Sequence, residues 1–251
     1  VALLTGQDNL REVTLFPLLK PLGKVEELES GAPAAEPAPS DTDSAGEQMS
    51  EEDRALLGTP ADDVDDLGIS TERARALFDE HVKTESLRRQ MEQASVVMGA
   101  MARTLGKNED AWRLLGLLHN LDFDTVKEPE RHCLVTAEIL GQEGVHPAGI
   151  HAIAAHNDKG LVATGIRCVS VMDHAVSAAE AVVGLIHACC QVLPSKDVKD
   201  LKVKSVRKRF KNRKFAANVE RDLIERCEGA GFALEDFLAL AVEALQQEPV
   251  A

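Results

Sequence analysis

The chain has 251 residues, 44% of them hydrophobic and 3% aromatic, which is enough for one well-packed domain with further segments attached. The formal net charge is −14, but residues 26–68 hold fourteen acidic residues against one basic residue, Arg54. That stretch therefore carries a net charge of −13, and the rest of the chain carries a net charge of −1. The total charge therefore gives no ground for assigning a basic or an acidic partner to the folded part.

The cysteine pattern argues against two classes of small domain. Five cysteines occur, an odd number, with no C-x-x-C spacing: Cys133, Cys168, Cys189, Cys190 and Cys227. This argues against a disulfide framework and a zinc knuckle, and favours a reducing compartment, the cytoplasm. The most apolar stretch, residues 177–193, contains Glu180 and His187. It is typical of a buried helix rather than a membrane span.

Residues 1–25 form the first of three zones. They contain "REVTLFPLLKP", in which a β-rich run from Val13 to Phe16 is stopped by Pro17. One strand cannot bury both of its faces, so it is predicted to belong to a sheet that this chain lacks. Because the chain opens on Val1 and an apolar run, we expect it to begin inside a larger protein.

The second zone, residues 26–69, is rich in proline, alanine, serine and acidic residues and has few large apolar side chains. Such a segment cannot bury enough surface to offset the entropy lost on ordering. We therefore predict a disordered acidic linker here.

The third zone, residues 70–251, has a helical period throughout. Ser70 precedes a helix as a capping residue, Gly106 ends the next helix, and Pro129 and Pro147 begin two others. The helix that ends at Gly106 carries an apolar stripe, formed by Leu87, Met91, Ala94, Met98 and Met101. The predicted helices lie near residues 71–82, 85–106, 110–121, 129–144, 147–157, 168–192, 219–228 and 234–247. The sequence thus predicts an all-α domain.

Four stretches in this zone occur in a characteristic order. They are "LLGLLHNLDFD" (114–124), "PERHCLVTAEIL" (129–140), "AIAAHN" (152–157) and "SAAEAVVGLI" (177–186). The series resembles the HD-type metal-dependent phosphohydrolase superfamily, in particular a group of predicted hydrolases, over about residues 75–247. The resemblance implies an HD-domain-like helical bundle. It also implies a divalent metal (Mn, Mg or Zn) held by a histidine, a consecutive His-Asp pair and a distant aspartate.

Three of the residues at these four family positions differ from the family pattern, and only His119 is unchanged. The first histidine corresponds to Gln90, the His-Asp pair to His119 and Asn120, and the last aspartate to Glu180. An amide oxygen is neutral and bridges two ions poorly, so losing one carboxylate and one imidazole weakens a four-ligand site. We expect a degenerate metal site, with poor or no metal binding and no catalysis.

Two other family histidines, His132 and His156, are present. One interpretation is a second metal site formed by His119, His132 and His156 with Asp122 or Asp124. If that site were active, His119 and Asp122 would be the catalytic candidates. The other interpretation is a polar pocket in which the histidines bond to the backbone. Asp122 and Asp124 would then cap the turn after the helix.

The N-terminal stretch "LLTGQDNLREVTLFPLLKP" (3–21) resembles a different family, the class II lysyl-tRNA synthetases. It is similar to the last segment of their catalytic domain, within residues 1–22, after the third class-defining motif. The resemblance implies a parent that ligates lysine to tRNA with ATP and Mg. The glycine and arginine residues that contact ATP in that family would precede Val1, so this chain alone is expected to be inactive as a ligase.

Residues 196–214 hold ten Lys or Arg residues against two Asp residues. One interpretation of Lys196–Lys214 is a contact with tRNA phosphates. The alternative is a solvated positive face, and only Phe210 and Phe215 are near for base stacking.

These observations lead to one hypothesis and two alternatives. The hypothesis is the C-terminal part of a lysine-tRNA ligase with an appended, degenerate HD-like domain. That domain would have a binding or regulatory role, with tRNA, a nucleotide or the synthetase catalytic domain as its partner. The first alternative is an active metal-dependent phosphohydrolase acting on a nucleotide or phosphomonoester. The second is a structural oligomerisation domain.

Overall fold

The computed structural model describes residues 55–128 and 130–250. The predictions for residues 1–25, with their strand, and for residues 26–54 lie outside this range. Within it, the all-α prediction is confirmed. The α-helices are α2 (Thr71–His81), α3 (Glu85–Leu105), α4 (Glu109–Leu118), α5 (Leu134–Gln142), α6 (Pro147–Ala155), α7 (Val171–Gln191), α8 (Val203–Lys211), α9 (Arg221–Glu225) and α10 (Leu234–Gln247). Short 3-10 turns are η2 (Val162–Thr164), η3 (Val198–Asp200) and η4 (Arg226–Glu228).

Several helix ends lie where the sequence predicts them. The Ser70 side chain accepts a hydrogen bond from the Arg73 backbone N–H and so caps α2. Gly106 ends α3 in the left-handed conformation, with φ 66°. Pro147 lies in the first turn of α6, where a missing N–H costs nothing. Local capping chemistry therefore sets these boundaries.

Helix α5 begins later than predicted. The sequence suggested a start at Pro129, whereas the helix begins at Leu134. Cys133, directly before it, has φ 75°, a left-handed conformation that cannot belong to a right-handed helix. The Asp122 carboxylate accepts hydrogen bonds from the Cys133 and Thr136 backbone N–H groups. It thereby fixes the first turn of α5 at this place.

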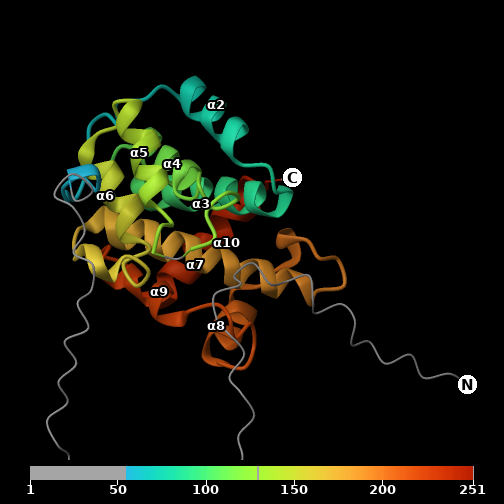
Figure 1. The fold of residues 1–251 in the computed structure, drawn as a ribbon. Coiled ribbons are helices and arrows are strands. Elements are labelled where there is room, and N and C mark those ends of the chain that lie inside the picture. The colour runs from blue at the N-terminus through green and yellow to red at the C-terminus, as the bar shows by residue number, and fades with distance from the viewer. Residues whose placement is uncertain (1–54, 129, 251) are drawn as a thin grey trace, which may run out of the picture. The chain divides into compact units, whose positions relative to one another are not determined.

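The two longest helices form the centre of the domain (Figure 1). Helix α3 packs against α4, α7 and α10, and α7 packs against α6, α8 and α9. The apolar stripe predicted on α3 lies wholly in the core: Leu87, Met91, Ala94, Met98 and Met101 are each 0 to 2% exposed. None of the described helices has both the length and the apolar character to cross a membrane.

Residues 55–69 correct the predicted linker, because they pack against the helices instead of being disordered. Leu57, Val64 and Leu67 are 4%, 6% and 2% exposed and belong to the core. Gly58 has φ 67° and approaches α6 so closely that a Cβ atom would lie 2.0 Å from the Pro147 carbonyl oxygen. The burial of three widely spaced apolar side chains thus holds this segment against the helices.

Acidic side chains of the same segment bind the helical domain through hydrogen bonds. The Trp112 indole N–H donates to Asp63 Oδ1 at 3.0 Å. The Val171 backbone N–H, at the start of α7, donates to Asp62 Oδ1 at 3.0 Å. A carboxylate at a helix N-terminus is favourable because of the unpaired N–H groups and the helix dipole. Two of the acidic residues that led to the prediction of disorder, Asp62 and Asp63, therefore hold the segment on the helical domain.

The close packing of α3 on α4 can be tested at Gly116. A Cβ atom there would lie 2.6 Å from the Ser95 backbone nitrogen and 2.7 Å from the Ala94 carbonyl oxygen. We expect Gly116→Ala to lower the free energy of unfolding by about 2–3 kcal/mol, because backbone atoms of α3 must move. Gly141→Ala, in α5 with open space around its Cβ position, is the control and should gain up to about 1 kcal/mol. Urea unfolding that finds Gly116→Ala as stable as the parent would contradict this packing.

Candidate metal centre

Seven polar side chains meet inside the domain, where the ends of α4 and α6 face the start of α5 and the middle of α7. We call this set the buried cluster. Its members and their exposed fractions are His119 (0%), Asn120 (1%), Asp122 (1%), His132 (8%), Cys133 (0%), His156 (7%) and Glu180 (6%). Protein atoms therefore enclose every group of the cluster.

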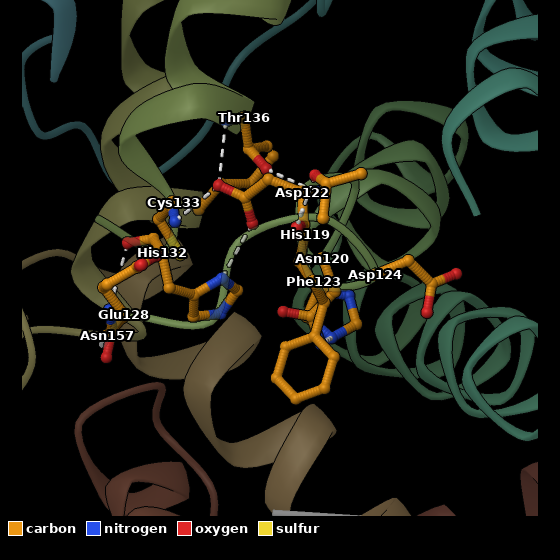
Figure 2. A network of polar contacts seen from close by, with 12 residues as sticks. His119, Asn120, Asp122, Phe123, Asp124, Glu128, His132, Cys133, Thr136 and Asn157 are labelled. Atoms are coloured by element: carbon orange, nitrogen blue, oxygen red, sulfur yellow. Dashed lines mark hydrogen bonds and ion pairs between the residues drawn. The ribbon is translucent and has the colours of Figure 1, made fainter. Parts of the chain in front are cut away.

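Asp122 organises one side of the cluster. Its carboxylate accepts hydrogen bonds from the Cys133 N–H at 2.8 Å, the Thr136 N–H at 3.1 Å and His132 Nδ1 at 2.7 Å, as Figure 2 shows. Burial alone raises the pKa of Asp122, but the hydrogen bonds and charge of His132 and the two backbone donors hold it below its ordinary value. Asp122 is therefore an ionised helix cap that also orients His132.

His132 and His156 each use one ring nitrogen to fix the ring. In His132, Nδ1 donates to Asp122, and in His156, Nδ1 donates to the Ile153 carbonyl oxygen at 2.5 Å. With the proton on Nδ1, a neutral ring at either position has its free lone pair on Nε2. The ring centroids are 5.4 Å apart. Metal-binding histidines are commonly oriented in this way, by a carboxylate or carbonyl on the other nitrogen.

The Cys133 thiol lies beside these two imidazoles. Its Sγ atom is 3.7 Å from His156 Nδ1 and 3.9 Å from His156 Nε2. One ligand atom from each of His132, Cys133 and His156 lies within 4.8 Å of the other two, so the trio can hold a metal ion. Ligands about 2.0–2.3 Å from one tetrahedral zinc ion are roughly 3.5 Å apart. Burial raises the pKa of the Cys133 thiol well above its ordinary value, so the thiol is protonated in the absence of a cation.

His119 and Asn120, the residues at the predicted His-Asp positions, bond to each other. His119 Nδ1 donates to the Gly116 carbonyl oxygen at 2.8 Å, and Asn120 Nδ2 donates to His119 Nε2 at 2.9 Å. Both ring nitrogens are thereby used, and burial lowers the pKa of His119 to about 4. The Asn120 amide thus occupies the lone pair that His119 would otherwise offer to a metal.

Glu180 brings a buried charge with weak pairing. Its Oε1 accepts from Asn120 Nδ2 at 3.4 Å, and its Oε2 lies 3.5 Å from His156 Nε2. Burial alone raises the pKa of Glu180, but the facing imidazoles of His156 and His119 outweigh burial and hold this pKa below its ordinary value. Burial also lowers the pKa of His156. No lysine or arginine within residues 55–128 and 130–250 pairs with Glu180, so a bound cation would neutralise this carboxylate.

One further atom of the cluster is unsatisfied: Asn120 Oδ1 is buried and has no hydrogen-bond partner in the described part of the chain. Buried polar groups are nearly always paired, and a bound ion or water would satisfy this oxygen. The remaining predicted ligand, Gln90, is 6% exposed and lies on α3. It makes no hydrogen bond to the described members of the cluster.

Asp124, the other carboxylate of the predicted second site, lies apart from the cluster. Its side chain accepts from the Lys83 N–H at 2.7 Å, the Thr84 N–H at 2.9 Å and Thr84 Oγ1 at 2.6 Å, at the start of α3. The Asp122 carboxylate thus binds the first turn of α5, and that of Asp124 binds the two residues before α3. Both sets of bonds lie elsewhere than in the turn after α4, where the sequence suggested that these carboxylates act as caps.

Cys133 is the functional residue that the sequence reasoning missed. The available signal was its position next to His132, but adjacent side chains in a helix point about 100° apart. Only the left-handed turn at Cys133 and the approach of α6 bring its sulfur to His156. Comparison with known proteins adds no precedent, since no family model, no curated protein and no solved structure matches the chain.

The burial of His119 predicts a specific loss of stability in acid. The pKa of His119 is about 4 in the folded chain against an ordinary value of 6.5, so the unfolded chain binds a proton first as the pH falls. The contribution is complete above pH 6.5, declines between pH 6.5 and pH 4, and amounts to about 3 kcal/mol.

Urea unfolding across this pH range should show a flatter profile for His119→Gln than for the parent. Leu118→Ala is the control, because it removes buried apolar volume without a titrating group. It should lower stability by about 2–5 kcal/mol at every pH. If the free energy of unfolding of His119→Gln falls with pH as steeply as that of the parent, the neutral, hydrogen-bonded state of this ring is contradicted.

Proposed function

We propose that the helical domain binds one divalent metal ion in the buried cluster and acts as a non-hydrolytic binding or regulatory module. The observation that carries this proposal is the Glu180 carboxylate, which is buried 3.5 Å from His156 Nε2 and is paired with no lysine or arginine of residues 55–128 and 130–250. Neutral histidines and a carboxylate are good ligands for first-row divalent ions. A bound cation would remove the main electrostatic cost of this arrangement.

Two features support a non-hydrolytic role. Catalytic metal sites keep a position open for water and substrate, whereas structural sites are closed. The cluster is of the closed kind, since its residues are 0 to 8% exposed. In addition, Asn120 stands where the resemblance implies a bridging aspartate, and its amide N–H blocks His119. An active phosphohydrolase remains the alternative, and it requires the cluster to open to a phosphomonoester.

The wider setting is a separate proposal that rests on sequence resemblance. The order of motifs in residues 114–186 supports an HD-like domain, and residues 3–21 support a lysine-tRNA ligase parent that uses ATP and Mg. The coding sequence upstream of Val1 tests the second point directly: it should encode the third motif of class II synthetases. Its absence there would remove the ligase from the proposal.

An RNA partner for Lys196–Lys214 is supported only by charge. Lys204 and Lys208 are exposed on one side of α8, whereas Arg207 is paired with Glu235 at 2.6 Å. Phosphate contacts would therefore come from the exposed lysines. A filter-binding assay with unfractionated tRNA in which the double variant Lys204→Glu/Lys208→Glu binds as well as the parent would exclude this surface.

Metal binding is tested by calorimetric titration of chelator-treated protein. We expect one ion per chain and a rise in the midpoint of thermal unfolding. Asp122→Asn should weaken affinity by about 10- to 100-fold, because His132 loses the carboxylate that orients it. Asp124→Asn, a matched loss of a carboxylate that binds two backbone N–H groups outside the cluster, should leave affinity unchanged.

Glu180→Gln provides a second arm if Asp122→Asn fails to fold, since it keeps the side-chain shape and removes the charge. It too should weaken binding. Failure of the parent chain to bind any divalent ion at millimolar concentration would contradict the proposal. Turnover of a nucleotide panel with manganese, lost in Glu180→Gln, would favour the phosphohydrolase alternative instead.

A further inference from the structure

We propose that Cys133 is a thiolate ligand of this centre, and that the centre selects zinc-type ions over magnesium and manganese. The inference rests on the proposed metal-binding function and adds to it the donor set and the class of ion. It assigns the donors to His132 Nε2, Cys133 Sγ and His156 Nε2.

The first support is geometric. His132 and Cys133 are neighbours in the chain, and consecutive side chains do not normally reach one point. Here Asp122 binds both residues, through the His132 ring and the Cys133 N–H. The left-handed turn at Cys133 places a ring nitrogen of His132, a ring nitrogen of His156 and the sulfur within 4.8 Å of one another. The separation of 3.9 Å between Cys133 Sγ and His156 Nε2 is close to that of two ligands on one ion.

The second support is backbone strain. Cys133 has φ 75° and is fully buried, in a backbone region that glycine occupies freely and that other residues adopt only at an energetic cost. Cysteine offers no hydrogen-bonding compensation for this conformation of the kind that asparagine or aspartate provides. Strained residues that persist at a cluster of ligand groups are typically retained for what they bind.

The third support is the chemistry of the donors. Thiolate and imidazole ligands suit Zn²⁺ and Co²⁺, whereas Mg²⁺ and Mn²⁺ prefer carboxylate, carbonyl and water oxygens. When the ion binds, the S–H bond of Cys133 breaks, a sulfur–metal bond forms and the proton leaves to solvent, with no change in oxidation state. Glu180 Oε2, 3.5 Å from His156 Nε2, is placed to approach the fourth position. Together with the thiolate it would balance the charge of a divalent ion.

Cobalt substitution in the full chain tests the assignment, because a thiolate on Co²⁺ gives a sulfur-to-metal charge-transfer band that nitrogen and oxygen ligands do not give. We expect the chelator-treated protein to show this band with Co²⁺, and Zn²⁺ to displace the cobalt. Mg²⁺ and Mn²⁺ should not compete at a hundredfold excess. Cys133→Gly should abolish the band and weaken zinc binding by at least tenfold, and glycine accepts the left-handed backbone.

Cys168→Ser is the matched control, because Cys168 also lies beside a histidine, with Sγ 3.2 Å from His174 Nδ1, but outside the cluster. It should keep both the band and the affinity. If Co²⁺ binds without the charge-transfer band, and binds Cys133→Gly with the same affinity as the parent, the thiolate assignment is overturned while the metal centre is left intact. Tighter binding of Mg²⁺ or Mn²⁺ than of Zn²⁺ would overturn the ion class. No binding of Co²⁺ or Zn²⁺ would overturn both proposals. If Cys133→Gly does not fold, the parent spectrum and Cys133→Ser decide the assignment.

Discussion

The site depends on one buried carboxylate, that of Asp122. It accepts hydrogen bonds from two backbone N–H groups at the start of α5 and from the ring of His132. Burying an ionised carboxylate is costly unless its oxygens are fully paired, and these three donors provide that pairing. The same contacts determine where α5 begins and how the His132 ring is oriented. They also require a left-handed backbone conformation at Cys133. Removing the carboxylate therefore affects the fold and the proposed centre together.

The buried cluster divides into a self-satisfied half and an open half. His119 and Asn120 use both imidazole nitrogens in hydrogen bonds to Gly116 and to each other. His132, Cys133 and His156 instead retain lone pairs or a thiol directed at one region. Glu180 lies between the halves, within 3.5 Å of both Asn120 and His156. The groups that come close enough together to hold an ion are therefore those at the start of α5 and the end of α6.

The fold was largely predictable because its signals are local. Ser70, Gly106 and Pro147 mark helix ends by capping and backbone chemistry, and the α3 stripe follows from the helical period. Two features were not predictable, because they arise from distant contacts. Residues 55–69 read as an acidic linker, yet Leu57, Val64 and Leu67 are buried by helices far along the chain. The participation of Cys133 depends on the turn that Asp122 imposes and on the approach of α6. His132 and His156 were identifiable by resemblance, but their grouping with a cysteine was not.

The most direct test of the account is diffraction from crystals of the zinc-treated protein, collected on both sides of the zinc absorption edge. We expect one anomalous peak per chain, bonded at about 2.0–2.3 Å to His132 Nε2, Cys133 Sγ and His156 Nε2, with the His119–Asn120 hydrogen bond intact. A peak clasped by His119, Asn120 and Glu180, or no peak within the buried cluster, would contradict it.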